Sequence, residues 1–319
     1  MTIKLSQNAL LGNEITNGPA PVLSDMMAGM NNPGFRPPAE ADSLILQIDQ
    51  GCPHNYCTFC GMYRGLQYRS LAVAEVHTLI TKESRRHPEA RRVFLADGDV
   101  MRRPFDELRE ILGMLNESLP GLARVNLYAN GSSIAAKSQE ELRALRSLKL
   151  HTLYMGLESG DEDILKRCRK GETAAQMVQA GTTAQAAGLR MSVMILLGLG
   201  GVDHSREHAE LTAQALNRMR PRLLSALRVI PVPGTELYDE VADASFRQLT
   251  EYEVVRELRN LINRLELAST VFRANHSSNV VPLEGRLPRD RQRLLAELDE
   301  LLAANALNRK SPAPMPLWL

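Results

Sequence analysis

Short apolar runs alternate with longer amphipathic segments along most of the chain. Six of these runs are typical of buried strands, because each is short and ends near Gly, Pro, Asn or Asp. They cover residues 43–48, 92–96, 125–129, 151–157, 192–197 and 223–230. A segment with helical spacing follows each run, so the strands are expected to pair in parallel through right-handed crossovers. This order predicts an α/β fold, a partial (β/α)6 barrel of the TIM type.

The two ends of the chain depart from this alternation. Residues 1–40 are rich in Asn, Gly and Pro, which predicts an irregular N-terminal extension. The barrel core is expected over residues 41–285, with a closing strand at 271–275. Residues 286–319 are expected to hold a helical segment, at 288–304, and a Pro-rich tail that is either disordered or docked as an extended arm.

Composition narrows the class of protein. The 319 residues carry 38 basic against 37 acidic side chains, a net charge of +1, so no global field favours nucleic acid. No basic aromatic patch is present either, and nucleic acid is not expected as a partner. No signal-peptide pattern opens the chain and no apolar run reaches spanning length, so no membrane partner is expected. The expected location is a reducing cytoplasm.

Three of the four cysteines lie within nine residues, directly after the first predicted strand. The run is Gly51-Cys52-Pro53-His54-Asn55-Tyr56-Cys57-Thr58-Phe59-Cys60. Three thiolates can hold three irons of a [4Fe–4S] cluster and leave the fourth iron open to a substrate or cofactor. A zinc site with His54 as fourth ligand remains an alternative, as do unliganded thiols. Cys168 lies in an apolar helical pattern and is expected in the core.

Polar residues and glycines follow the later strands, at the edge where barrels of this type carry their sites. Asp97-Gly98-Asp99 follows the second strand, and Asn130 follows the third. Glu158 ends the fourth strand, where a carboxylate needs a partner. The run 198–201 after the fifth strand is rich in glycine but lacks the Lys-Ser/Thr of a phosphate-binding Walker motif.

With these motifs in this order, residues 43–240 resemble the radical S-adenosylmethionine (SAM) superfamily. The likeness is to the branch of oxygen-independent coproporphyrinogen oxidases, the Elongator catalytic subunit and methylthiotransferases. One departure is that four residues, instead of three, separate Cys52 from Cys57. The resemblance implies a [4Fe–4S] cluster on Cys52, Cys57 and Cys60. It also implies reductive cleavage of SAM to a 5′-deoxyadenosyl radical that abstracts hydrogen from a substrate, and an external electron donor of flavodoxin or ferredoxin type.

The resemblance further implies which residues contact SAM. The 97–99 turn is expected at the amino group, Glu158 at the ribose and Lys170 at the carboxylate. The full set of expected SAM contacts is Phe59, Asp97, Gly98, Asp99, Asn130, Glu158, Lys170, Gly198 and Val232.

The substrate side is less defined by the sequence. The chain has no second set of cysteines for an auxiliary cluster, which argues against methylthiotransferases and against maturases of modified peptides. Together with the lack of a basic aromatic patch, this favours a small-molecule substrate over tRNA. An arginine pointing into the barrel would pair with a substrate carboxylate or phosphate, whereas one pointing outward would not. The alternative function is a non-catalytic haem or iron–sulfur carrier on the same scaffold. The catalytic candidates are Arg228, Tyr63 and His54, and Arg273, Asn275 and His276 occur where the barrel would close.

Overall fold

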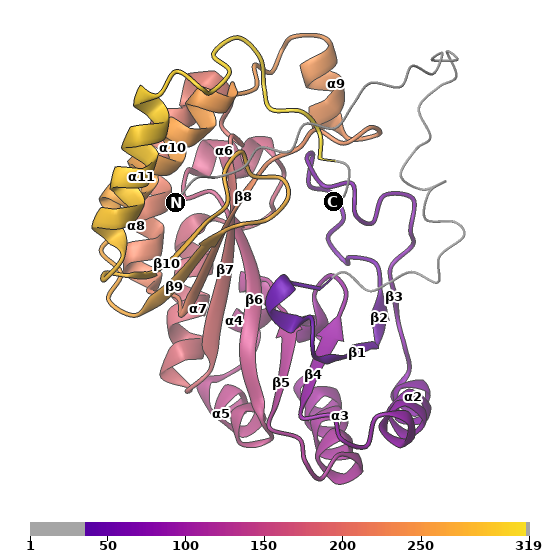
Figure 1. The fold of residues 1–319 in the computed structure, drawn as a ribbon. Helices are drawn as coiled ribbons and strands as arrows, with labels where there is room; N and C mark the ends of the chain where they lie inside the picture. Colours follow the sequence, from indigo (N-terminus) through magenta and orange to yellow (C-terminus); the bar gives the residue numbers. More distant parts are fainter. Residues whose placement is uncertain (1–35, 317–319) are drawn as a thin grey trace, which may run out of the picture. The chain divides into compact units, whose positions relative to one another are not determined.

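An eight-stranded sheet organises residues 36–316, the part of the chain that the computed structural model describes (Figure 1). Its strands are ordered β1-β4-β5-β6-β7-β8-β9-β10, and all neighbours are parallel except β9 and β10. The bounds are Leu44–Gln47 (β1), Arg92–Ala96 (β4), Arg124–Tyr128 (β5), Leu150–Glu158 (β6), Arg190–Leu197 (β7), Leu223–Arg228 (β8), Thr270–Ala274 (β9) and Leu283–Leu287 (β10). A separate antiparallel ribbon consists of Asp49–Gln50 (β2) and Arg69–Ser70 (β3).

Helices connect the successive parallel strands, as parallel pairing requires. Ser138, Thr173 and Thr250 each precede a helix, and each hydroxyl accepts the backbone N–H three residues further on. The α-helices are Val73–Arg86 (α2), Phe105–Ser118 (α3), Gly131–Ala135 (α4), Gln139–Ser147 (α5), Glu162–Arg167 (α6), Ala174–Ala186 (α7), Gly201–Met219 (α8), Glu236–Ala242 (α9), Glu251–Arg264 (α10) and Arg291–Ala303 (α11). The short 3₁₀ helices are Pro38–Glu40 (η1) and Val100–Arg102 (η2). Within the described residues, no helix is both long and apolar enough to cross a membrane.

The sheet has an outer face covered by helices and an inner face with its own aromatic cluster. Alternate strand residues, such as Leu224 and Ala226, belong to the main core shared with the helices. On the inner face, the rings of Phe94, Tyr128 and Tyr154 meet edge to face, with centroids 5.0 to 6.2 Å apart. This alternation gives the direction in which a strand side chain points.

The predicted α/β fold, a partial TIM-like barrel, is confirmed. The six predicted strands correspond to β1, β4, β5, β6, β7 and β8, and the predicted closing strand corresponds to β9. β10 was not predicted, because charged residues flank a central glycine in its sequence, a composition that disfavours a strand. The boundary predicted between residues 285 and 286 falls inside β10, and most of the predicted extension 1–40 lies outside the described residues.

Candidate functional site

The loop between β2 and β3 carries the three clustered cysteines. Cys52, Cys57 and Cys60 are partly exposed free thiols. Cys168 is 1% exposed and lies in a small apolar cluster, as its helical spacing predicted. The β2–β3 pairing joins the two ends of this loop, so its base is fixed by backbone hydrogen bonds. The rest of the loop is held by contacts with other parts of the chain.

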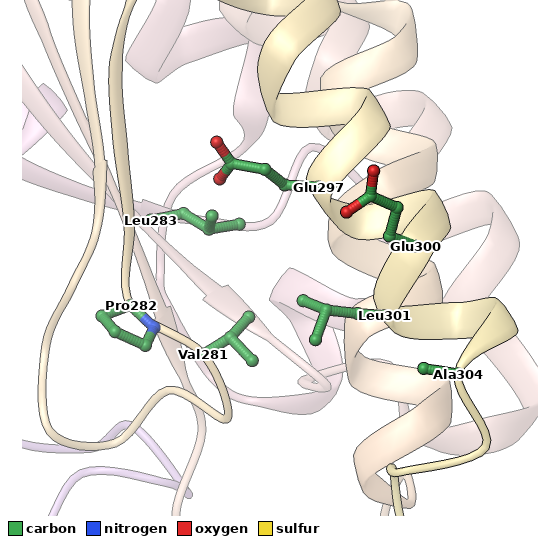
Figure 2. Close-up of a pocket in the computed structure, with 7 residues that line it drawn as sticks. All are labelled: Val281, Pro282, Leu283, Glu297, Glu300, Leu301 and Ala304. Atoms are coloured by element: carbon green, nitrogen blue, oxygen red, sulfur yellow. The ribbon is translucent and has the colours of Figure 1, made fainter. Parts of the chain in front are cut away.

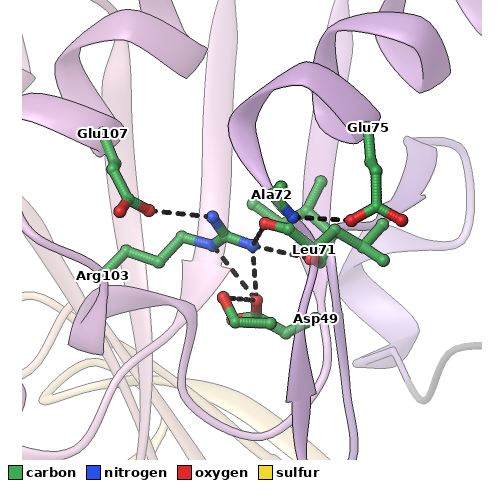
Figure 3. A network of polar contacts seen from close by, with 8 residues as sticks. Asp49, Leu71, Ala72, Glu75, Arg103 and Glu107 are labelled. Carbon is green, nitrogen blue, oxygen red and sulfur yellow. Dashed lines mark hydrogen bonds and ion pairs between the residues drawn. The ribbon is translucent and has the colours of Figure 1, made fainter.

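A buried ion pair between Arg103 and Asp49 fixes the base of this loop (Figure 3). Arg103 donates Nη2 and Nε to Asp49 Oδ1, at 2.7 and 3.1 Å. It also donates to the carbonyl oxygens of Ile48 and Leu71, both at 2.8 Å, and to the Glu107 carboxylate at 3.1 Å. The planar guanidinium therefore ties the end of β1, the start of α2 and the first turn of α3 to one point.

Two glycines allow the loop to approach the chain closely. A Cβ on Gly98 would lie 2.5 Å from the Cα of Cys52, so no side chain fits where the turn after β4 meets the loop. A Cβ on Gly171 would lie 2.7 Å from Cε1 of His54. The imidazole Nε2 of His54 lies 2.7 Å from the carbonyl oxygen of Arg169. His54 thus docks the loop on residues 169–171, and its predicted catalytic role stays a prediction.

Backbone contacts attach the tip of the loop to two further segments. The Thr58 N–H donates to the Cys168 carbonyl at 3.0 Å, and the Leu237 N–H donates to the Thr58 carbonyl at 3.1 Å. A Cβ on Gly61 would lie 3.0 Å from Cγ1 of Val232. The structure therefore brings Val232 against the cysteine loop, although the two are far apart in the sequence.

The thiols of the cysteine loop hold their protons until a metal ion binds and displaces them. Burial raises the pKa of the Cys57 thiol to about 12, and Lys170 offsets only part of this rise. Burial also raises the pKa of the Cys60 thiol. Both thiols are therefore protonated at neutral pH until a thiophilic metal binds. Three sulfur donors fit a [4Fe–4S] cluster with an open iron, because the His54 Nε2 of the same loop lies against the Arg169 carbonyl oxygen instead.

A single metal ion would need a tighter arrangement than the loop presents. Across residues 36–316, no three His, Cys, Asp or Glu side chains converge to hold one ion. A cubane cluster differs from a single ion because each thiolate binds a separate iron.

An ion pair between Glu158 and Lys170 lies at the end of β6. Lys170 Nζ is 3.2 Å from Glu158 Oε1, and the two side chains are only 9% and 13% exposed. A Cβ on Gly156 would lie 2.0 Å from that carboxylate oxygen, so the ion pair packs against the backbone of β6 at a position where only glycine fits. Glu158 has a φ of 62°, which is strained for a non-glycine residue and typical of functional sites. Burial acts to lower the pKa of Lys170, but Glu158 and Cys57 outweigh it and the pKa is raised.

The two aspartates after β4 already have partners inside the protein. Asp97 is fully buried and accepts Gln47 Nε2 at 2.5 Å and the Tyr63 hydroxyl at 3.2 Å. Asp99 accepts the backbone and side-chain N–H groups of Asn130, at 3.1 and 3.2 Å. Burial raises the pKa of both carboxyl groups. These bonds position the turn and the start of α4, and direct contact of Asp97, Asp99 or Asn130 with SAM stays a prediction.

A buried network behind the site was not predicted from the sequence. Glu257, 1% exposed on α10, accepts the Gly198 N–H at 2.7 Å and the Ser205 hydroxyl at 2.6 Å. His208 Nε2 lies 3.8 Å from Glu257, and His208 Nδ1 lies 2.8 Å from the Ser159 hydroxyl. The network therefore joins the turn after β6 to the turn after β7. The only sequence signal is a carboxylate on the apolar face of a helix.

Arg228 is not placed for the substrate contact predicted for it. Its side chain lies on the same face of β8 as Leu224, which packs in the core shared with the helices. The guanidinium donates to three carbonyl oxygens, those of Ser278 (2.6 Å), Ala313 (3.1 Å) and Pro314 (2.8 Å). Arg228 thus holds residues 313–314 of the Pro-rich tail in place.

Tyr63 and Phe59 both pack inside the protein. Tyr63 is 4% exposed, and burial and the neighbouring Asp97 raise its pKa. Phe59 packs against the small apolar cluster that includes Cys168 and Leu199. A catalytic role for Tyr63 and an adenine contact for Phe59 stay predictions.

A separate hollow of about 430 Å³ lies between α11 and the segment entering β10 (Figure 2). Its lining combines two carboxylates with apolar side chains: Val281, Pro282, Leu283, Glu297, Glu300, Leu301 and Ala304. None of the predicted site residues lines it, so it is not part of the candidate site.

Comparison of the sequence with known protein families identifies the family of this chain. Residues 46–212, more than half of the chain, match the model of the radical SAM superfamily. A protein described as an uncharacterized methyltransferase of Pyrococcus horikoshii is 26% identical over 200 residues, which cover 61% of this chain and 41% of that protein. The chain therefore spans less than half the length of this curated relative.

Solved structures of similar fold have low sequence identity. Methylornithine synthase aligns with a TM-score of 0.49 and 18% identity, over 90% of this chain and 86% of that one. Coproporphyrinogen III oxidase from Escherichia coli aligns with a TM-score of 0.47 and 13% identity, over 84% and 72%. The family match, together with the cysteine loop at the end of a parallel sheet, establishes that this chain belongs to the radical SAM superfamily, whose cofactors are a [4Fe–4S] cluster and SAM.

Proposed function

We propose that this protein is a radical SAM enzyme that acts on a small molecule. Cys52, Cys57 and Cys60 would hold the [4Fe–4S] cluster, and the open iron would bind SAM. When bound, the two cofactors and an electron supply a 5′-deoxyadenosyl radical that takes a hydrogen atom from the substrate. The electron comes from an external donor of flavodoxin or ferredoxin type.

The observation that carries this proposal is the position of the Glu158–Lys170 ion pair beside the cysteine loop. Thr58 bonds to the carbonyl of Cys168, two residues before Lys170, and Lys170 is close enough to Cys57 to lower the pKa of its thiol. One ammonium and one carboxylate beside the thiols suit a ligand that has its own carboxylate and hydroxyl groups. Lys170 would take the SAM carboxylate, and Glu158 would accept hydrogen bonds from the ribose.

The other predicted residues would shape the SAM site. Gly98 brings the backbone of its turn against Cys52, and no side chain occupies that contact. Gly198 adopts a φ of 82°, with its N–H held by Glu257. Val232 lies against Gly61 of the cysteine loop. These contacts would place backbone groups of three strand ends around one ligand.

Anaerobic reconstitution tests the cofactor assignment. We expect about four irons per chain and a low-temperature electron paramagnetic resonance spectrum of the reduced cluster that changes when SAM is added. Cys57→Ala should lose the cluster, whereas Cys168→Ala should keep it. A spectrum unaffected by SAM in a fully loaded protein would favour the alternative of a cluster or haem carrier.

A further inference from the structure

Arg273 on β9 is a cation without a partner in the described chain. Its neighbours Phe272 and Ala274 are fully buried in the core shared with the helices, so Arg273 lies on the inner face of the sheet. Its Nε atom is buried and has no hydrogen-bond partner. Glu284 lies directly opposite on β10, yet its carboxylate accepts Asn275 Nδ2, at 3.4 Å, and makes no ion pair with Arg273. A buried donor without an acceptor is unfavourable unless a ligand supplies one.

The strand register places Arg273 in line with the candidate site. Arg273 pairs with Ser225 on β8, Ser225 pairs with Met194 on β7, and Met194 pairs with Gly156 on β6. Gly156 is the residue on which the ion pair at the end of β6 rests. Three strand spacings of about 4.8 Å separate the two ends of this row, about 14 Å along the sheet. The Arg273 side chain lies at one end of this row and the Glu158–Lys170 ion pair at the other, so a small molecule between them can contact both.

A second buried group without a partner lies in the adjacent row. The hydroxyl of Ser192 on β7 has no hydrogen-bond partner within the described residues. Ser192 pairs with Tyr154, whose ring belongs to the inner aromatic cluster. The inner face of β7 to β9 therefore offers two buried donors, the Nε of Arg273 and the hydroxyl of Ser192, that have no hydrogen-bond partner within the described residues. This is the arrangement expected where a polar ligand completes the hydrogen bonds.

We propose that Arg273 binds an anionic oxygen group of the substrate, a carboxylate or a phosphate. A guanidinium presents two parallel N–H groups that match either anion. Arg228, the other arginine considered for this role, already donates to three carbonyl oxygens on the outer face. The assignment rests on the proposed radical SAM function, because it places the reacting carbon of the substrate between Arg273 and the bound SAM.

Calorimetric titration of the cluster-loaded, SAM-bound protein tests this assignment. Glutarate and inorganic phosphate are the two probes, each at constant ionic strength, and they distinguish a carboxylate from a phosphate ligand. Arg273→Gln should weaken binding of the preferred probe by about tenfold or more, as the loss of charge-assisted hydrogen bonds predicts. Arg273→Lys should retain part of the affinity. Arg286→Gln is the matched control. Arg286 is an exposed arginine on the neighbouring strand β10, where it pairs with Val271, two residues before Arg273.

Several results would overturn the assignment. These are no saturable binding of either probe to the unaltered protein, equal binding by Arg273→Gln, or an equal loss in Arg286→Gln. A marked fall in the thermal midpoint of ligand-free Arg273→Gln would instead indicate a structural arginine, since an unpaired guanidinium adds no hydrogen bond to the fold. SAM cleavage without substrate is measured separately in the same samples. Its absence in the unaltered protein would contradict the proposed function, whereas its persistence in the control variant Arg286→Gln is expected.

Discussion

Glu257→Ala tests whether the buried network behind the site holds the two strand-end turns in place. The change removes the acceptor of the Gly198 N–H and of the Ser205 hydroxyl, which lie 2.7 and 2.6 Å from the carboxylate oxygens. It also removes the carboxylate that faces His208 at 3.8 Å. Because Glu257 is 1% exposed, water is not available to replace these contacts without a rearrangement.

The expected loss follows from the two orphaned donors. A buried donor without an acceptor costs about 1–3 kcal/mol, so two donors cost about 2–6 kcal/mol. A central value of about 4 kcal/mol lowers the thermal midpoint by about 6 °C, because an unfolding entropy of about 2.1 cal/mol/K per residue applies to 319 residues. Glu257→Gln keeps a side-chain oxygen that accepts the Gly198 N–H. Its amide N–H can donate to the Ser205 hydroxyl oxygen once that hydroxyl rotates. Its cost is expected to be about 1 kcal/mol.

The assay combines thermal unfolding with SAM binding to the cluster-loaded protein. Glu300→Ala, which removes an exposed carboxylate on α11, is the control and should leave both unchanged. SAM affinity should fall about tenfold in Glu257→Ala, about 1.4 kcal/mol, and little in Glu257→Gln. A stable Glu257→Ala protein, or one that loses stability but binds SAM normally, would refute the role of the network in positioning the turns.

Glu257 also predicts how the stability of the folded protein changes with pH. Burial raises the pKa of Glu257, although His208 and Ser205 oppose this. The folded state then binds the proton more tightly than the unfolded state, so the contribution is full below the ordinary glutamate pKa of about 4.3 and is lost as pH rises through the folded-state value. Glu257→Gln cannot ionise and should flatten this decline in urea unfolding measured from about pH 4.3 upward. An unchanged decline would assign the pH dependence to other groups.

Three further changes test the loop and its supports. Cys57→Ala should abolish iron binding while Cys168→Ala retains it, measured as iron per chain; a dependence on both would contradict the assignment of ligands. Gly98→Ala should lower the iron content and thermal midpoint, because the new Cβ would lie 2.5 Å from the loop backbone; full loading would show that the loop can shift. Arg103→Leu leaves the Asp49 carboxylate buried without its cation and should cost about 3–5 kcal/mol in urea unfolding. A loss below about 1 kcal/mol would mean that water replaces the arginine.

The sequence predicted those elements whose signal is local. Each parallel strand is a short apolar run bounded by turn residues, and the cysteine loop follows the first of them. Glu158 at a strand end required a partner, and the structure supplies Lys170 at 3.2 Å. β10 was missed because it depends on its pairing with β9 and has little strand propensity of its own.

Features that depend on distant contacts could not be predicted in this way. The strand that carries Arg228 is apolar on both faces, so its sequence does not say which way the arginine points. Glu257 meets Gly198 across 59 residues, and a glutamate in a helix is normally expected to be exposed. The partners of Asp97, Gln47 and Tyr63, come from two other segments of the chain.

The most direct test of the proposed function is whether the protein cleaves SAM. The cluster-loaded protein is reduced anaerobically, supplied with SAM, and assayed for 5′-deoxyadenosine and methionine, with Cys57→Ala as the matched control. We predict that both products form in equal amounts with the unaltered protein and that neither forms with the variant. Intact SAM after incubation with a fully loaded, reduced cluster would contradict the enzymatic function.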